Sequence, residues 1–337
     1  AAFRLSHKEM MGMKRIGAAF AMAFAAAIFA SQSSSGSIAG IGNSEVWAKQ
    51  DTIVNIKEEQ IPLGSKPGAA NVKKPQAPGT VTFSSNSAMI DASNVSHGYV
   101  MIQYTGKASK IKVQIMKNGG ETYTYDLNAR SAYEVFPLTE GNGTYTVRVL
   151  EQVQGNQYAV KSNNQLSVNL KSEFEPFLYP NQYVNFSSGS AVAAKSEELA
   201  ASASDSLGVI TNVYNYVVNN FTYDTALANT VESGYLPNVD QVLAKKKGIC
   251  FDYAAVMTAM LRSQNIPTKL VVGYTGNVYH AWVNVYIEGQ GWVDNIIYFD
   301  GYNWKLMDPT FASSGGNSPT IKEYITNSSN YKAKYTY

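Results

Sequence analysis

The feature that most constrains the fold of this chain is a change in the spacing of its apolar residues near residue 170. Before it, short segments alternate apolar and polar residues, which is typical of half-buried strands. After it, apolar residues first recur at helical spacing and then return to strand-like runs. With 337 residues the chain is long enough for two modest domains and extensions. We therefore predict two domains of different structural class.

Residues 79–170 are predicted to form an all-β domain. Glycine-rich turns at 118–120 and 141–143 separate the candidate strands. The strands expected are 99–104, 111–115, 122–125, 144–149 and 166–168. This spacing, without helical runs, indicates an antiparallel sandwich of the immunoglobulin or fibronectin kind, acting as a spacer or docking module. His97 is interpreted as an ordinary surface or turn residue.

Residues 171–337 are predicted to form an α+β domain. Ser204 or Asp205 is positioned to cap one helix, and Asn238 a second that Gly248 would stop. Cys250 opens a third helical run over 251–262. Strands are expected at 270–274, 279–287 and 291–293. Helices followed by antiparallel strands define the α+β class.

The amino end has the pattern of a secretory signal peptide. Lys14 and Arg15 precede the apolar run 16–30, and small and polar residues follow. We predict a signal peptide over 1–48, with an uncleaved membrane anchor as the alternative, and a disordered Pro-containing linker over 49–78. The protein is therefore expected to be secreted or displayed on the cell surface. Cleavage is expected after Ala30, Ala39 or Ala48.

The composition excludes several functions. The formal net charge is +2 and no recognition motif is present, so a nucleic-acid partner is not expected. The absence of a His/Cys cluster and of a Gly-rich phosphate loop predicts no metal and no cofactor. The single cysteine cannot form an internal disulfide. The 23 tyrosines suit exposed strands that keep the hydroxyl in water.

Three stretches carry candidate catalytic residues: Gly248–Tyr253, Tyr279–Val283 and Trp304–Thr310. A cysteine in the first turn of a helix lies at the positive end of the helix dipole, which favours the nucleophilic thiolate. The backbone N–H groups there can also receive an oxyanion. A histidine on a neighbouring strand can pair with the thiolate and protonate a leaving group, while a carboxylate orients the imidazole.

These stretches resemble the transglutaminase-like superfamily, a papain-like group of cysteine enzymes. The shared pattern is Gly-x-Cys-x-Asp at a helix start, then His-Ala-Trp on a strand, then Asp-Pro-Thr. The resemblance covers about residues 173–337 and not the all-β part. It implies that Cys250 is the nucleophile, His280 the general acid and base, and Asp308 the orienting carboxylate. Asp294, after Gly291-Trp292-Val293, is the alternative third member.

Other residues near these motifs have plainer interpretations. Asp252 is read as a structural cap or salt link, because its spacing turns it away from Cys250. Trp282 and Trp292 are read as packing aromatics, and residues 245–247 as a solvated helix end. Tyr223 or Tyr235 is a candidate second oxyanion donor.

The resemblance implies acyl transfer from an amide through a thioester, with a protein or peptide substrate, cell-wall peptide among them. An amine acceptor would give crosslinking and water would give hydrolysis. The alternatives are a cysteine protease or amidase acting on wall or surface peptides, and a non-catalytic surface binding module.

Overall fold

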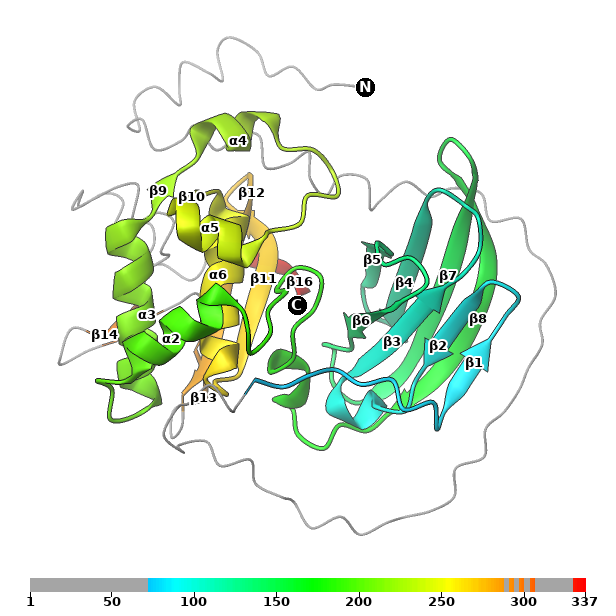
Figure 1. Ribbon diagram of the computed structural model, residues 1–337, viewed down its shortest axis with the longest axis horizontal. Helices are drawn as coiled ribbons and strands as arrows, with labels where there is room; N and C mark the ends of the chain where they lie inside the picture. The colour runs from blue at the N-terminus through cyan, green and yellow to red at the C-terminus, as the bar shows by residue number, and fades with distance from the viewer. Residues whose placement is uncertain (1–71, 288–290, 294–296, 300–303, 307–329) are drawn as a thin grey trace. The chain divides into compact units, whose positions relative to one another are not determined.

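The computed structural model describes residues 72–287, 291–293, 297–299, 304–306 and 330–337 (Figure 1). Two compact units divide these residues, one over 75–176 and the other over 177–337 together with 72–74. The predicted signal peptide and most of the predicted linker lie outside the described residues. Within the last part of that linker, the Gln76 amide donates a hydrogen bond of 3.0 Å to the hydroxyl of Tyr99.

The first unit is built from antiparallel strands and one short 3-10 helix, η5 (Val95–His97). Its two four-stranded sheets have the orders β1-β2-β3-β6 and β5-β4-β7-β8. All five predicted strands are present, whereas β1, β2 and β6 were missed because their sequences do not alternate cleanly. The strands are β1 (Thr82–Ser84), β2 (Ala88–Asp91), β3 (Tyr99–Tyr104), β4 (Ile111–Lys117), β5 (Thr122–Asp126), β6 (Tyr133–Pro137), β7 (Gly143–Gln154) and β8 (Gln157–Val168).

Side chains from both sheets contact each other in the core of this unit. The Tyr125 ring meets Phe136 edge-on, with centroids 5.3 Å apart, which joins β5 of one sheet to β6 of the other. The Tyr104 hydroxyl donates to Glu151 at 2.7 Å and Tyr145 donates to the Gly141 carbonyl at 2.8 Å. Tyr104, Tyr125 and Tyr145 are buried, so the expectation that strand tyrosines keep their hydroxyls in water is wrong for them.

A chain of polar contacts ties the segment after β8 back to η5. His97 Nδ1 lies 2.9 Å from Glu175 Oε2, and Lys171 Nζ lies 2.9 Å from His97 Nε2. The Lys171 amide also donates to the Ser96 carbonyl at 2.8 Å. The first unit therefore continues to Pro176. His97 lies in the turn η5, in agreement with the prediction of a surface or turn residue, and its contacts fasten this segment.

The second unit places helices before antiparallel strands. The helices are α2 (Ala191–Ala200), α3 (Ser206–Asn220), α4 (Thr225–Thr230), α5 (Val239–Lys245) and α6 (Cys250–Ser263), after the 3-10 turn η6 (Glu175–Phe177). The strands are β9 (Thr222–Tyr223), β10 (Lys247–Gly248), β11 (Thr268–Thr275), β12 (Val278–Ile287), β13 (Gly291–Val293), β14 (Ile297–Phe299), β15 (Trp304–Leu306) and β16 (Tyr331–Thr336). The main sheet has the order β13-β12-β11-β16.

The predicted helix starts are confirmed at two caps. The Asp205 side chain accepts from the Gly208 amide, and the Asn238 side chain accepts from the Gln241 amide. The predicted stop at Gly248 is wrong, because α5 ends at Lys245 and Lys246 adopts the left-handed conformation with φ of 50°.

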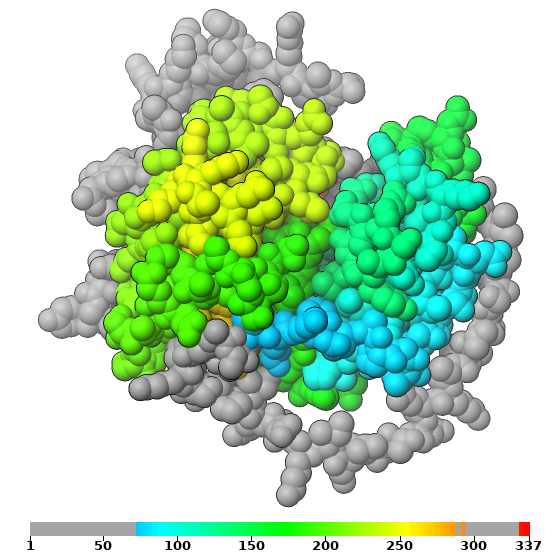
Figure 2. Space-filling view, viewed as in Figure 1, coloured from blue at the N-terminus to red at the C-terminus, as the bar shows by residue number. Residues whose placement is uncertain are grey.

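Helix α6 is the centre of the second unit. Every one of its residues is buried, and it packs against α2, α3 and α5 as well as β11 and β12. Figure 2 shows that on this face the helices (green to yellow) cover the strands, of which little orange is visible. In the described part of the chain, no helix combines the length and apolar character needed to cross a membrane.

Candidate active site

Cys250 is the first residue of α6, as predicted. Ile249 precedes it in an extended conformation, and the Tyr253 amide donates to the Ile249 carbonyl at 3.0 Å, which starts the helical ladder. The cysteine is 4% exposed. This position is the positive end of the dipole of a buried helix.

Asp252 organises the beginning of this helix. Its Oδ2 accepts a 2.9 Å hydrogen bond from the Ile249 amide, the returning half of a capping box. Its Oδ1 accepts a 2.7 Å bond from the Tyr235 hydroxyl. The interpretation of Asp252 as a structural cap is confirmed.

The glycine of the Gly-x-Cys-x-Asp pattern, Gly248, is explained by the lack of space for a side chain at this position. A Cβ added to Gly248 would lie 2.6 Å from Cβ of Asp252 and 2.8 Å from its Oδ2. Any larger residue would push the carboxylate away from the Ile249 amide. Gly248 also belongs to β10, which pairs in parallel with β9, so the segment following α3 runs beside the approach to Cys250.

His280 lies near the beginning of β12, directly opposite Gly273 on β11. Cross-strand register puts Trp282 opposite Val271 and Asn284 opposite Lys269, so these three β12 side chains share one face. The intervening Ala281, Val283 and Val285 are buried on the other face, as predicted.

His280 has an aromatic neighbour on its own face. The imidazole is 1% exposed and its ring stacks near the Trp282 indole, with centroids 6.3 Å apart. Trp282 in turn meets Tyr331 edge-on at 5.3 Å, whereas Trp292 contacts Phe177 and Tyr286. Both tryptophans therefore pack against other rings, in agreement with the interpretation from sequence.

The packing of α6 against β12 brings the elements that carry Cys250 and His280 together. The neighbour of His280 in the chain, Tyr279, is buried, and this burial raises the pKa of its phenol. The smaller contributions that raise this pKa include one from Cys250. The two motifs, 30 residues apart in the chain, thus meet in one region of the fold.

The third member of the predicted set lies outside the described residues. Strand β15 ends at Leu306, two residues before Asp308, and β13 ends at Val293, one residue before Asp294. The choice between these two carboxylates stays a prediction.

Burial changes the electrostatics of Asp252 strongly. Removal from water raises the pKa of this carboxyl to about 6, against the hydrogen bonds from Ile249 and Tyr235, which lower it. Asp224 raises the pKa further and Lys245 lowers it, both by smaller amounts. Burial likewise raises the pKa of Tyr235. This phenol is therefore a neutral donor to the carboxylate.

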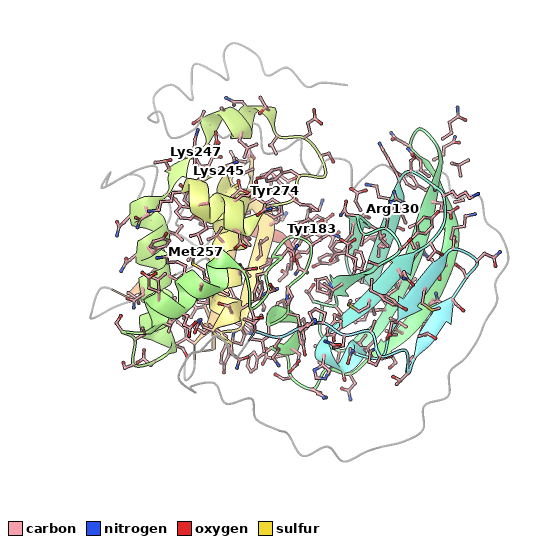
Figure 3. All side chains as sticks on the ribbon, viewed as in Figure 1. Arg130, Tyr183, Lys245, Lys247, Met257 and Tyr274 are labelled. Atoms are coloured by element: carbon pink, nitrogen blue, oxygen red, sulfur yellow. The ribbon has the colours of Figure 1, made fainter. Side chains whose placement is uncertain are left out.

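The role suggested for one tyrosine near the site needs revision. Since the Tyr235 hydroxyl donates to Asp252, it is not available as a second oxyanion donor while that bond holds. Tyr223 lies on β9 beside Gly248. Lys245 and Lys247 lie around the end of α5 (Figure 3), and both are exposed, as predicted for a solvated helix end. Lys247 Nζ lies 3.3 Å from Asp224 Oδ1. Among the described residues, no group of three or more His, Cys, Asp or Glu side chains is arranged to hold a metal ion.

The described residues thus place a cysteine at the beginning of a buried helix that packs on the strand carrying His280. Residues 193–309 match the family model of the transglutaminase-like superfamily. This part of the chain is therefore a transglutaminase-like domain, and the resemblance inferred from the motifs is confirmed.

The individual proteins that resemble this chain share at most a quarter of the aligned residues with it. The uncharacterized protein YebA of Bacillus subtilis (strain 168) is 25% identical over 219 residues, which cover 58% of this chain and 29% of YebA. The chain thus matches less than a third of that relative's length.

Two solved structures are similar at 15% identity, each with a TM-score of 0.32. The periplasmic domain of TgpA from Pseudomonas aeruginosa matches over 74% of this chain and 80% of its own. A proposed cysteine protease from Cytophaga hutchinsonii matches over 68% and 69% respectively.

Proposed function

We propose that this protein is a secreted cysteine enzyme that transfers the acyl group of an amide in a protein or peptide, with Cys250, His280 and Asp308 as its reacting set. The observation that carries the proposal is the placement of Cys250 as the first residue of the buried helix α6, packed on the strand of His280. Peptides of the cell wall or of surface proteins are the substrate class that fits an exported enzyme.

The proposed reaction has two steps. The Cys250 thiolate bonds to the carbonyl carbon, the C–N bond breaks, and the nitrogen leaves as ammonia or an amine with a proton from His280. The resulting thioester is then attacked by an amine or by water, whose proton passes to His280 as the thiolate is released. Asp308 would hold the imidazole in the required tautomer.

The burial of the two reacting side chains supports transfer to an amine. Cys250 and His280 are 4% and 1% exposed. Exclusion of water is the condition under which an amine competes with water for a thioester. Hydrolysis by the same residues is the nearest alternative. The all-β unit would serve as a spacer or docking module.

Mass spectrometry of the protein with a glutamine-containing protein and a labelled primary amine tests this function. We expect amine incorporation by the wild type and none by Cys250→Ala. Asp308→Asn should reduce the rate by about a hundredfold or more through loss of imidazole orientation, whereas the matched change Asp294→Asn should not.

Other outcomes would change the proposal in defined ways. Deamidation or cleavage that depends on Cys250, without incorporation, would identify a hydrolase at the same site. A stronger effect of Asp294→Asn than of Asp308→Asn would transfer the orienting role to Asp294. No product dependent on Cys250 with any glutamine-containing protein tested would favour a non-catalytic binding module.

A further inference from the structure

Tyr274, near the end of β11, presents an aromatic ring to solvent beside the candidate active site. In the described part of the second unit it is the one large hydrophobic side chain that is exposed, at 38%. Its direct cross-strand partner on β12 is Tyr279, the residue before His280. The two rings meet edge-on, with centroids 5.2 Å apart. Tyr274 therefore extends an aromatic contact from the strand of His280 out to the surface.

Tyr279 links this exposed ring to the beginning of α6. It is buried, and its phenol interacts electrostatically with Tyr274 and with Cys250. Tyr183, labelled with Tyr274 in Figure 3, interacts with the same phenol, and its ring contacts Phe251 with centroids 5.6 Å apart. Phe251 follows Cys250 directly in the chain. The exposed ring of Tyr274 thus lies at the edge of the region that holds the candidate nucleophile.

Lys332 lies on the other side of Tyr274, on the edge strand β16. The two residues are direct partners in the β11–β16 register, so their side chains leave the same face of the sheet. Lys332 is exposed, and no carboxylate of the described residues forms an ion pair with it. An aromatic ring and an ammonium group are therefore offered together at this surface.

Tyr279, Tyr274 and Lys332 form a row across three neighbouring strands. Neighbouring strands lie about 4.8 Å apart, so the row measures about 10 Å from Tyr279 to Lys332. An extended peptide advances about 3.3 Å per residue, so the row matches about three residues of such a peptide. A peptide with its reacting amide at Cys250 can therefore pass over Tyr274 and reach Lys332.

We propose that Tyr274 and Lys332 form a substrate subsite that selects peptides with an acidic residue within about three positions of the reacting amide. The Tyr274 ring would pack against the peptide, and the Lys332 ammonium would pair with its carboxylate. The inference rests on the proposed function and deepens it, because it names the class of peptide that the same site accepts. Binding alone can test it, without turnover.

Binding of fluorescently labelled glutamine peptides to the Cys250→Ala protein, followed by anisotropy, measures this selection. The peptides are made in pairs, with aspartate or asparagine at one of the positions within about three residues of the glutamine, on either side. Aspartate and asparagine have nearly the same shape, so each pair isolates the charge. We expect the aspartate peptide of the best-placed pair to bind about threefold more tightly, which is the effect of an exposed ion pair.

Variants in the Cys250→Ala background assign the selection to the two side chains. Lys332→Met should abolish the preference for aspartate. Lys246→Met is the matched control, because it removes an exposed ammonium after α5 and should keep the preference. Tyr274→Ala should weaken the binding of both peptides of the pair about fivefold, since the aromatic contact is lost, whereas Tyr274→Phe should not.

The proposal is overturned if aspartate and asparagine peptides bind equally at every position, or if none of them binds. A preference that survives Lys332→Met, or binding that Tyr274→Ala leaves unchanged, overturns it as well. The amine-incorporation test is a separate result. If the preference holds but no product depends on Cys250, the subsite stands and the proposed reaction falls.

Discussion

Asp252 shows how burial can turn a helix cap into a group that charges near pH 6. Its spacing predicted a cap, and the bond from the Ile249 amide confirms that role. The second bond, from Tyr235, joins residues 17 positions apart in sequence. Only the folded chain brings that phenol to the carboxylate and excludes water from Asp252. The cap was thus predictable locally, and the raised pKa was not.

The raised pKa of Asp252 predicts that it destabilises the fold at neutral pH. Its pKa rises from 3.8 to about 6, so the folded state binds more protons between these values and stability falls as pH rises through them. At about 1.4 kcal/mol per pH unit, the loss above about pH 6 is about 3 kcal/mol. Asp252→Asn should therefore gain stability relative to the wild type between about pH 4 and about pH 7.

Urea unfolding of both proteins at several pH values measures this difference. Asp240→Asn, changed in the same way on α5, provides the baseline for a half-buried helix-capping carboxyl. A difference between Asp252→Asn and the wild type that stays constant with pH would show that the carboxyl ionises normally in the folded state.

At the scale of elements, α6 holds the second unit together through a buried cation at its other end. Arg262 is completely buried and donates to three backbone carbonyls, at 2.9 Å to Thr268, 2.6 Å to Tyr179 and 2.7 Å to Tyr337. These acceptors come from the segment before α2, from β11 and from the residue after β16. Burial lowers the pKa of the guanidinium to about 9.

We predict that Arg262→Met destabilises the protein by about 3 kcal/mol or more, because three buried carbonyls lose their donor. Arg148→Met is a matched control, since its hydrogen bond to Asn163 is exposed and should contribute little. Chemical denaturation checks both variants. A loss for Arg262→Met no larger than for Arg148→Met would mean that water or the surrounding chain replaces the guanidinium.

Gly273 is a second link between elements. Its added Cβ would lie 2.1 Å from the Lys332 carbonyl, at the point where the β11–β16 register shifts. Because Gly273 has no side chain, β16 can approach β11 at this position. Gly273 is also the residue of β11 that pairs with His280 on β12. The sequence signalled strand β11 correctly, but the bulge depends on a partner nearly 60 residues further along the chain.

At the scale of the whole molecule, the described residues form two units, each with its own core. The boundary lies at residue 176, beyond the predicted end of the all-β domain at 170. The reason is the attachment of Lys171 and Glu175 to His97 and Ser96. Such contacts depend on side chains that are distant in sequence, so periodicity could not have located them.

We expect a fragment of residues 75–176 to fold by itself and to be more stable than a fragment of residues 75–170. The shorter fragment loses the His97–Glu175 contact and the Lys171–Ser96 hydrogen bond, together worth about 1 to 3 kcal/mol. Thermal unfolding followed by circular dichroism compares them. Equal stabilities would indicate that the segment after β8 contributes nothing to this unit.

The features that could be predicted from the sequence alone are local: the class of each half, half of the strands in the described residues, two helix caps and the motifs around Cys250 and His280. These follow from side-chain periodicity and from hydrogen bonds that span three or four residues. The tertiary structure decided which distant groups meet, including Tyr235 with Asp252, Arg262 with three carbonyls and α6 with β12. Burial is a property of the assembled chain, and so are the shifted pKa values that it causes.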